Sequence, residues 1–343
     1  MNRIKVALAI VMICSVGVIG IGLLSSDIFV NKGTPHENIN IHSDNDISNY
    51  NFTGSGSRND PYLISGLYIV HESTCIEIWT TEKYFIIENC YLVPGGGNGI
   101  EIRVSSGSNV DGQYIIRNCI ITSTSYYGVG IAVSQSLGCN IIDNTISGAH
   151  VWGINVGGHD NCKITGNKVS GGGISISDGD NIQCTDNTVL DCEGNGIDIL
   201  RITSSPAVTG NRIERCEGNG MDINARNLVV ENNYISNCGE NGIFVFYNNG
   251  MVVENNTILN NLLDGIHFEG WSSSDVMANC KAIANTIDGN GGSGIYLIYT
   301  QGATLTDNDL VNNGEWGIHI VSSTSYTTSG NYYEGNILGA MNP

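Results

Sequence analysis

The chain has 343 residues, among them 45 Gly and only 5 Pro, and it has little of the Ala, Leu, Glu and Lys mixture that fills helices. This composition favours many short strands joined by tight turns. The formal net charge of -19, with few basic residues and no basic patch, argues against nucleic acid and anionic lipid as partners, and suits neutral or cationic ligands and calcium.

The N-terminal segment predicts export from the cytoplasm. Arg3 and Lys5 precede an uncharged, largely apolar run over residues 6–24, which is the layout of an export signal or a membrane anchor. The run is long enough to span a bilayer and lacks a clear cleavage site, so residues 1–26 fit both a cleaved signal peptide and a retained anchor helix. We therefore predict an extracellular or cell-surface location, with membrane attachment if the segment is retained.

Residues 27–46 are polar and patternless and predict a linker, whereas residues 47–343 carry one repeat throughout. The first repeated feature is a Gly followed by an apolar, any, apolar triplet, with successive glycines 20 to 31 residues apart: Gly99, Gly130, Gly153, Gly173, Gly196, Gly220, Gly242, Gly265, Gly294 and Gly317. The second is an Asn two residues before an apolar or aromatic position, with the same period: Asn89, Asn118, Asn144, Asn167, Asn187, Asn211, Asn233, Asn256, Asn285, Asn308 and Asn331.

These two columns predict an all-β fold, a single-stranded right-handed parallel β-helix of about 11–12 coils, because one coil alone buries almost nothing and stacked coils bury a continuous core. Within each triplet the outer side chains point inward and the middle one points outward. We expect the Asn to take left-handed backbone angles at a corner and to pass amide hydrogen bonds between coils. We expect the Gly to supply either a positive φ or a close approach at another corner.

Two motifs resemble a known family. The stretch Gly54-Ser-Gly-Ser-Arg-Asn-Asp60-Pro61-Tyr-Leu-Ile64 is similar to the glycine-rich, Asp-Pro-Tyr opening of many exported β-helix proteins, and a Tyr-Phe-Ile-Ile-Glu-Asn coil follows at 84–89. From about Ile47 to Tyr333 the chain resembles the parallel β-helix repeat proteins grouped with the copper-site maturation protein NosD and with carbohydrate-active β-helices such as pectate lyases. That resemblance implies the coil but not the activity, since the same scaffold serves lyases, hydrolases, epimerases, surface proteins and metal-delivery factors.

The outward middle residues of the triplets predict one exposed stripe, and candidate catalytic residues gather in its later half. Asp198 and Asp222 fall on neighbouring coils, close enough to bind calcium, to share a proton or to act as a glycosidase pair. His267, Tyr296 and His319 follow on three successive coils, and such a set can abstract and return a proton next to a uronate carboxylate.

Three further residues are predicted to bind substrate. Arg201 follows Asp198 and can pair with a substrate carboxylate or with the aspartates, and Glu269 shares the face of His267. Trp271 lies on an insertion over residues 270–279 and offers a platform for a sugar ring. A second insertion, over residues 104–111, is expected at the same edge of the coils.

The eleven cysteines include ten outside the export signal, and two states remain open for these ten. Equivalent positions on adjacent coils lie within disulfide range, and small thiols also pack as buried apolar groups. No Cys-x-x-Cys motif is present, so no metal site of that kind is predicted. Calcium at the two aspartates is the one candidate cofactor.

Two functions remain open from the sequence. The stripe predicts an exported protein that binds, and in one version processes, a polysaccharide or cell-surface glycan. The alternative is a non-catalytic surface scaffold or adhesion protein, because any exported β-helix must cover its outer faces with polar side chains. The motif sets of polygalacturonases and alginate epimerases are absent from the stripe. Whether the protein is an enzyme (a polysaccharide lyase, epimerase or glycoside hydrolase) and its oligomeric state are left undecided.

Overall fold

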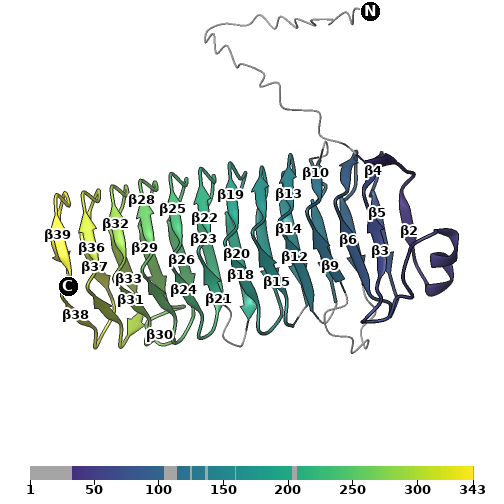
Figure 1. The fold of residues 1–343 in the computed structure, drawn as a ribbon. Helices are drawn as coiled ribbons and strands as arrows, with labels where there is room; N and C mark the ends of the chain where they lie inside the picture. The colour runs from purple at the N-terminus through teal and green to yellow at the C-terminus, as the bar shows by residue number, and fades with distance from the viewer. Residues whose placement is uncertain are drawn as a thin grey trace, which may run out of the picture. The chain divides into compact units, whose positions relative to one another are not determined.

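The computed structural model describes residues 33–103, 114–123, 126–135, 138–158, 160–202 and 207–342. Three strands per coil build three long sheets in which neighbouring strands run parallel (Figure 1). The predicted all-β parallel solenoid is confirmed, with about 11 turns. The predicted signal or anchor and the insertion at 104–111 lie outside the described residues. Within the described part of the chain, no helix is long and apolar enough to cross a membrane.

The chain visits the sheets in the order C, A, B in each coil, and among the described residues these sheets hold 12, 13 and 13 strands respectively. Sheet C contains β3 (Tyr62–Ser65), β6 (Phe85–Glu88), β9 (Tyr114–Arg117), β12 (Cys139–Ile142), β15 (Lys163–Thr165), β18 (Gln183–Thr185), β21 (Ala207–Thr209), β24 (Val229–Glu231), β27 (Val252–Glu254), β31 (Lys281–Ile283), β35 (Thr304–Thr306) and β38 (Thr327–Ser329). Sheet A contains β1 (Thr34–Pro35), β4 (Leu67–His71), β7 (Tyr91–Pro94), β10 (Ile120–Thr122), β13 (Thr145–Ser147), β16 (Lys168–Ser170), β19 (Thr188–Leu190), β22 (Arg212–Glu214), β25 (Tyr234–Ser236), β28 (Thr257–Leu259), β32 (Thr286–Asp288), β36 (Asp309–Val311) and β39 (Tyr332–Glu334).

Sheet B carries the Gly triplets and therefore the predicted stripe. Its strands are β2 (Ile39–Ile41), β5 (Ile76–Trp79), β8 (Ile100–Arg103), β11 (Ile131–Ser134), β14 (Trp152–Gly157), β17 (Gly173–Ser177), β20 (Ile197–Ile202), β23 (Met221–Ala225), β26 (Ile243–Phe246), β29 (Ile266–Glu269), β33 (Ile295–Ile298), β37 (Trp316–Val321) and β40 (Gly339–Asn342). In every central strand the outer residues of the triplet are buried, as in Ile243 and Val245, and they form a continuous core inside the stack. This alternation confirms the predicted inward and outward directions.

A row of buried asparagines occupies the corner between sheets C and A. At each step one Asn accepts two hydrogen bonds from the Asn of the preceding coil: Asn211 donates its backbone N–H and its Nδ2 to Asn233 Oδ1 at 2.8 and 3.0 Å. Asn233 Nδ2 also donates to the carbonyl of Val208 at 3.0 Å. The row comprises Asn144, Asn167, Asn187, Asn211, Asn233, Asn256, Asn285, Asn308 and Asn331. The predicted ladder is therefore present.

The prediction was wrong in two details of this corner. Asn89 and Asn118 lie one position too early, and Cys90 and Cys119 stand in the row instead, with the Cys119 N–H donating to Asn144 Oδ1 at 3.0 Å. The left-handed backbone also belongs to the residue before the ladder Asn, such as Asn232 with φ 56°, and not to the ladder Asn itself. One residue turns the chain and the next carries the hydrogen bonds.

The column glycines have no positive φ, so that half of the prediction was wrong and the close-approach half is confirmed. A Cβ added to Gly220 would lie 2.3 Å from Ile235 Cγ2 and 2.6 Å from the carbonyl oxygen of Gly242. The same two kinds of neighbour crowd Gly196 and Gly242. Glycine is required here because a side chain would collide with the next coil.

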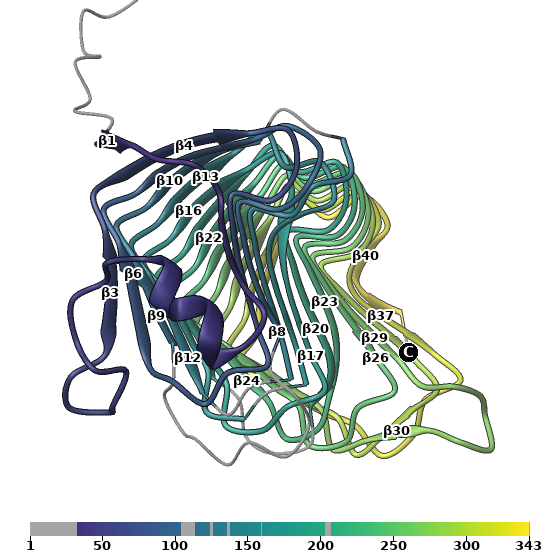
Figure 2. The ribbon, with the colours of Figure 1, turned by 90° about the vertical axis from the view of Figure 1, so that its right-hand side faces the viewer.

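Ordered coil structure begins within the segment predicted to be a linker. β1 pairs with β4 and β2 pairs with β5, and the 3-10 helix η1 (Asp44–Asn49) follows them. Figure 2 shows η1 lying across the first coil, where its Ile47 is buried. A segment with few apolar residues can do this because its two inward isoleucines, Ile39 and Ile41, suffice for one strand of sheet B.

The ten cysteines from Cys75 to Cys280 are buried free thiols, as one of the two predicted alternatives states. Several of them stack on adjacent coils. Cys139 and Cys162 approach each other with their Sγ atoms 3.0 Å apart. They act here as small apolar core groups.

Candidate functional site

The outward residues of sheet B lie in register from strand to strand, as predicted. The predicted exposure was wrong for Glu101, Ser175 and Asp198, which are buried among neighbouring side chains on the sheet. Asp198 pairs with Asp222, Phe244 with His267, and Tyr296 with both His267 and His319. The whole row, read from the N-terminal coil, is Asn40, Glu77, Glu101, Ala132, Asn155, Ser175, Asp198, Asp222, Phe244, His267, Tyr296, His319 and Asn342. One outward side chain is thus presented per coil.

Asp198 and Asp222 form a carboxyl pair bridged by an amide. Asn195 Nδ2 donates to Asp198 Oδ1 at 2.9 Å and to Asp222 Oδ2 at 3.4 Å. Burial, with the neighbouring Asp222 charge as a smaller cause, raises the pKa of Asp198 to about 6, against the lowering effect of Asn195. Burial and the charge of Glu240 also raise the pKa of Asp222. The pair is therefore suited to holding a proton near neutral pH.

The pair by itself supplies few of the ligands of a calcium ion. Calcium takes about six to eight oxygen ligands, and one oxygen of each of the two carboxyl groups accepts a hydrogen bond from Asn195 Nδ2. Within the part of the chain that the structure describes, no group of three or more His, Cys, Asp or Glu side chains could hold a metal ion.

His267 lies between two carboxylates on β29 and its preceding corner. Its Nδ1 is 2.9 Å from Asp264 Oδ2, and its Nε2 is 3.5 Å from Glu269 Oε2, an ion-pair distance without a hydrogen bond. Asp264 is itself fixed, because its Oδ1 accepts the backbone N–H of Ser293 at 2.6 Å. The imidazole is thus oriented by one carboxylate while its other nitrogen faces a second.

Tyr296 and His319 continue the row on β33 and β37. The Tyr296 ring centroid lies 4.6 Å from that of His267 and 4.8 Å from that of His319, the latter edge to face. Burial, together with the nearby acidic charges of Asp264 and others, raises the pKa of Tyr296 and keeps its phenol protonated. His319 Nδ1 lies 3.7 Å from Glu315 Oε2. The three predicted residues therefore form one contiguous group.

Trp271 is the most prominent aromatic side chain beside this group, with 67% of its surface exposed. Its ring lies 5.6 Å from Phe246 and 6.5 Å from Tyr247, centroid to centroid. Tyr247 donates its hydroxyl to Asp275 at 2.8 Å, which ties the loop of Trp271 to the neighbouring coil. That loop ends at β30 (Met277–Ala278), which pairs with β34 (Thr300–Gln301). Trp271, Phe246 and Tyr247 therefore form one aromatic cluster.

Arg201, near the end of β20, forms an ion pair with Asp178. Its Nε and Nη2 donate to the two carboxylate oxygens of Asp178 at 2.5 and 2.6 Å. Of the two predicted roles, pairing with an aspartate is the one seen, although the partner is Asp178 and not Asp198 or Asp222. The structure does not bring Arg201 to the His267 group.

Several residues of this region were missed by the sequence reasoning, above all Asn195, Asp264 and Phe246. Asn195 and Asp264 each stand directly before a column glycine, at the corner between sheets A and B. With Asn219 and Asn241 they form a row whose members are joined by hydrogen bonds between coils. The repeated Asn-Gly pair was a usable signal for that corner. Phe246 gave no such signal, because its role depends on the position of Trp271.

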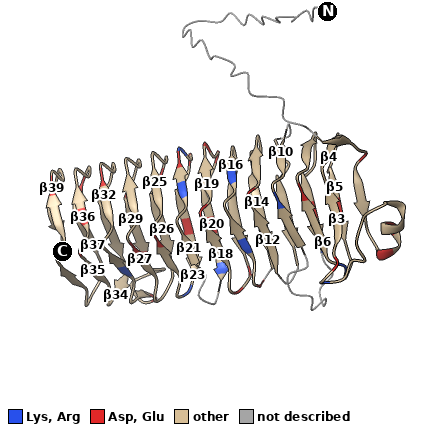
Figure 3. Cartoon of the chain, viewed as in Figure 1, with Lys and Arg blue, Asp and Glu red and all other residues tan. Residues whose placement is uncertain are grey.

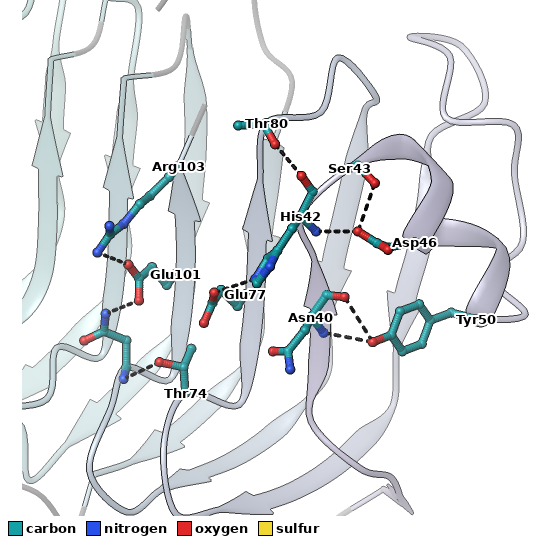
Figure 4. A network of polar contacts seen from close by, with 11 residues as sticks. Asn40, His42, Ser43, Asp46, Tyr50, Thr74, Glu77, Thr80, Glu101 and Arg103 are labelled. Atoms are coloured by element: carbon teal, nitrogen blue, oxygen red, sulfur yellow. Dashed lines mark hydrogen bonds and ion pairs between the residues drawn. The ribbon is translucent and has the colours of Figure 1, made fainter. Parts of the chain in front are cut away.

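A second polar network lies at the N-terminal end of the same sheet (Figure 4). His42 Nε2 is 2.7 Å from Glu77 Oε1, and Glu101 Oε1 is 2.5 Å from Arg103 Nη2. The Trp79 ring on β5 stacks on that of His42, with 4.4 Å between the ring centroids. The guanidinium of Arg103, on β8 of the next coil, lies 5.0 Å from the centroid of the Trp79 ring. Charged and aromatic groups therefore gather at both ends of sheet B.

Comparison with known proteins agrees with this architecture. A model of the right-handed β-helix region matches residues 129–281, and no curated protein matches the sequence significantly. A mutant of the periplasmic alginate epimerase AlgG superposes with a TM-score of 0.57 at 13% identity, covering 90% of this chain and 85% of the epimerase. The surface protein and adhesin PfbA of Streptococcus pneumoniae gives 0.56 at 9% identity, with 82% and 91% covered. The chain therefore contains a right-handed β-helix region, and its likeness to these proteins is one of fold.

Proposed function

We propose that the protein is exported and binds a polysaccharide along the later half of sheet B, from Asp198 to His319. The observation that carries this proposal is the exposed Trp271 cluster next to the half-buried and oriented His267. Solvent-exposed aromatic rings beside hydrogen-bonding side chains are the usual means of holding a sugar ring. The likeness in fold to a periplasmic alginate epimerase supports an extracytoplasmic, glycan-related role without assigning the reaction.

A linear ligand suits the shape of this surface. Parallel strands place one outward side chain about every 4.8 Å along the stack, which is roughly the length of one pyranose unit in an extended glycan. Asp222, Phe244, His267 and Tyr296 occupy successive coils in exact register. A polymer lying across the strands would therefore meet a new side chain at each unit.

The charge of the coils from residue 227 onward favours an uncharged glycan. Lys281, on sheet C, is the only Lys or Arg between residues 227 and 342, whereas acidic residues recur throughout that stretch. Figure 3 shows the same scarcity of basic residues in the C-terminal coils. Asp264, Glu269 and Glu315 would repel a polyanionic uronan. The guanidinium of Arg226 lines a hollow with Tyr247 of the Trp271 cluster, together with that of Arg201, which Asp178 holds.

The same group contains the side chains for proton transfer. Asp264 orients His267, whose Nε2 makes no hydrogen bond, and the Tyr296 phenol lies against the imidazole. In a reaction on a bound sugar, His267 would accept a proton and Tyr296 would donate one. Binding alone needs only the aromatic cluster and the carboxylates.

A binding and turnover screen of the purified protein against neutral and acidic polysaccharides tests the proposal. Trp271→Ala is expected to weaken neutral-glycan binding by about tenfold through the lost stacking, and His267→Ala to abolish any product. Tyr332→Ala, which removes an exposed aromatic ring from sheet A, is the matched control and should bind as the native protein does. Equal binding by all three variants, or binding by none including the native protein, would favour the surface-scaffold alternative.

A further inference from the structure

A hollow of about 510 Å³ lies on sheet B, nearer the N-terminus than the Trp271 cluster. It is lined by side chains of β8, β11, β14 and β17, together with the corner before β8. No predicted site residue lines it. It is therefore separate from the group built around His267.

The hollow exists because small side chains occupy the middle of the sheet. The outward residues of β11, β14 and β17 include Ala132, Ser134, Gly157 and Ser177, of which Ser134, Gly157 and Ser177 follow one another in register. On one side of them stand the larger Glu101 and Arg103 of β8, and on the other side β20 presents Leu200 opposite Ser177. The depression therefore results from small side chains that lie between larger ones along the stack.

The lining is polar and internally neutral. Glu101, only 7% exposed, pairs with Arg103 at 2.5 Å through one oxygen and accepts Asn98 Nδ2 at 2.9 Å through the other (Figure 4). The remaining polar groups are the amides of Gln135 and Asn155 and the serine hydroxyls. Uncharged donors and acceptors around a balanced ion pair match the hydroxyl groups of a neutral sugar better than a charged ligand.

We propose that this hollow is a second subsite for the glycan, which takes an uncharged, hydroxyl-rich segment of the same polymer. The inference rests on the proposed function and extends it. Five strand steps, from β14 through β17, β20, β23 and β26 to β29, separate the hollow from His267, a distance of about 24 Å along the stack. Only a ligand of several sugar units can reach both places, so affinity must rise with ligand length.

The test measures affinity against ligand length by titration with size-fractionated neutral gluco-, manno- and xylo-oligosaccharides of about two to about ten units. The native protein should bind the longest members at least about tenfold more tightly than the shortest. Ala132→Tyr, which fills the hollow from an outward position, should abolish this gain and leave affinity for the short members unchanged. Thr188→Tyr, outward on sheet A, is the control and should keep the full gain.

Ser134→Tyr provides a second filling variant, and thermal unfolding confirms that each variant is folded. Binding of long and short members with equal affinity by the native protein, or an undiminished gain in both folded filling variants, would overturn the second subsite while leaving the proposed function intact. Absence of binding to every neutral oligosaccharide would overturn both.

Discussion

Asp198 shows how a single outward side chain can set the pH dependence of the fold. Its pKa is raised from the ordinary 3.8 to about 6, mainly by burial. The folded state therefore binds the proton more tightly than the unfolded chain does, so this group stabilises the protein fully below the unfolded pKa. That contribution is lost as pH rises through about 6, at a cost of up to about 3 kcal/mol.

Asp198→Asn should consequently be more stable than the native protein at about pH 7.5, by about 1–3 kcal/mol, and equally stable at about pH 4. The free energy of unfolding in urea at the two pH values checks this. Asp309→Asn, an exposed aspartate of sheet A, is the control and should show neither effect. A native protein that gains stability between pH 4 and 7.5 through Asp198 would contradict the assignment.

The buried thiols make a second prediction at this scale. Burial raises the pKa of Cys75 to about 11 and those of Cys184 and Cys280 to about 12. Because the thiolate is the reactive form, these cysteines should resist alkylation by iodoacetamide at about pH 8 until the protein unfolds. Mass spectrometry of peptides labelled with and without denaturant measures this, and rapid labelling of the native protein would show that the core opens readily.

The contacts of single residues could be predicted from the sequence within strands, where side chains alternate regularly. They could not be predicted at the corners between strands. The register of Asp198 and Asp222 follows from strand alternation and a constant period. The contact of Asp264 with His267 could not be predicted in the same way, because it joins a corner residue to a strand residue and depends on the corner's conformation. The engagement of Arg201 by Asp178 likewise depends on a left-handed backbone at Arg201 that no motif marks.

At the scale of the element, the coil corner is the unit that the repeat specifies. The sequence predicted the asparagine row but placed its first two members one residue early, since Asn-Cys stands in those coils where later coils have a turn residue followed by Asn. A second row at the next corner runs from Cys238 through Asn261 to Asn290: the Cys238 N–H donates to Asn261 Oδ1, and Asn261 Nδ2 donates to Asn290 Oδ1. Thiol and amide evidently fill equivalent positions, and only the three-dimensional register reveals that equivalence.

The column glycines give the sharpest prediction for an element. Gly220→Ala should lower the free energy of unfolding by about 1–3 kcal/mol, because its Cβ would collide with Ile235 and with the backbone of Gly242. Gly194→Ala is the matched control, since no atom lies within 4 Å of its added Cβ, and it should change stability by less than about 1 kcal/mol. Urea unfolding of both variants decides the matter, and equal stabilities would refute the close-packing explanation.

For the molecule as a whole, charge dominates the solution behaviour. With a net charge of -19 and Lys281 as the only Lys or Arg from 227 to 342, the C-terminal coils repel one another. Raising NaCl from about 0.02 to about 0.5 M should therefore raise Tm by several degrees through screening. Calcium chloride at matched ionic strength should add nothing further, and a large extra stabilisation by calcium would reveal an ion site that the carboxyl pair does not provide.

The fold of the whole molecule could be predicted best, because a solenoid repeats one sequence pattern. An error in one coil does not change a fold that is indicated by many coils. The function could be predicted less well, since the cluster of Trp271, Phe246 and Tyr247 and the hollow beside Glu101 both arise from side chains on different coils. Neither belongs to the repeat. Residues that depart from the repeat are the ones that distinguish one β-helix surface from another.

The shared period of the corners has one more consequence. Residues 196–219 make up one complete period, and their removal would join Asn195 directly to Gly220, leaving each row intact with one member fewer. Loss or duplication of whole coils therefore preserves every packing rule, whereas loss of a strand or a corner leaves the neighbouring coils without its partners. A gene of this kind can lengthen or shorten the solenoid by one coil at a time, and natural variants should differ in length by entire coils.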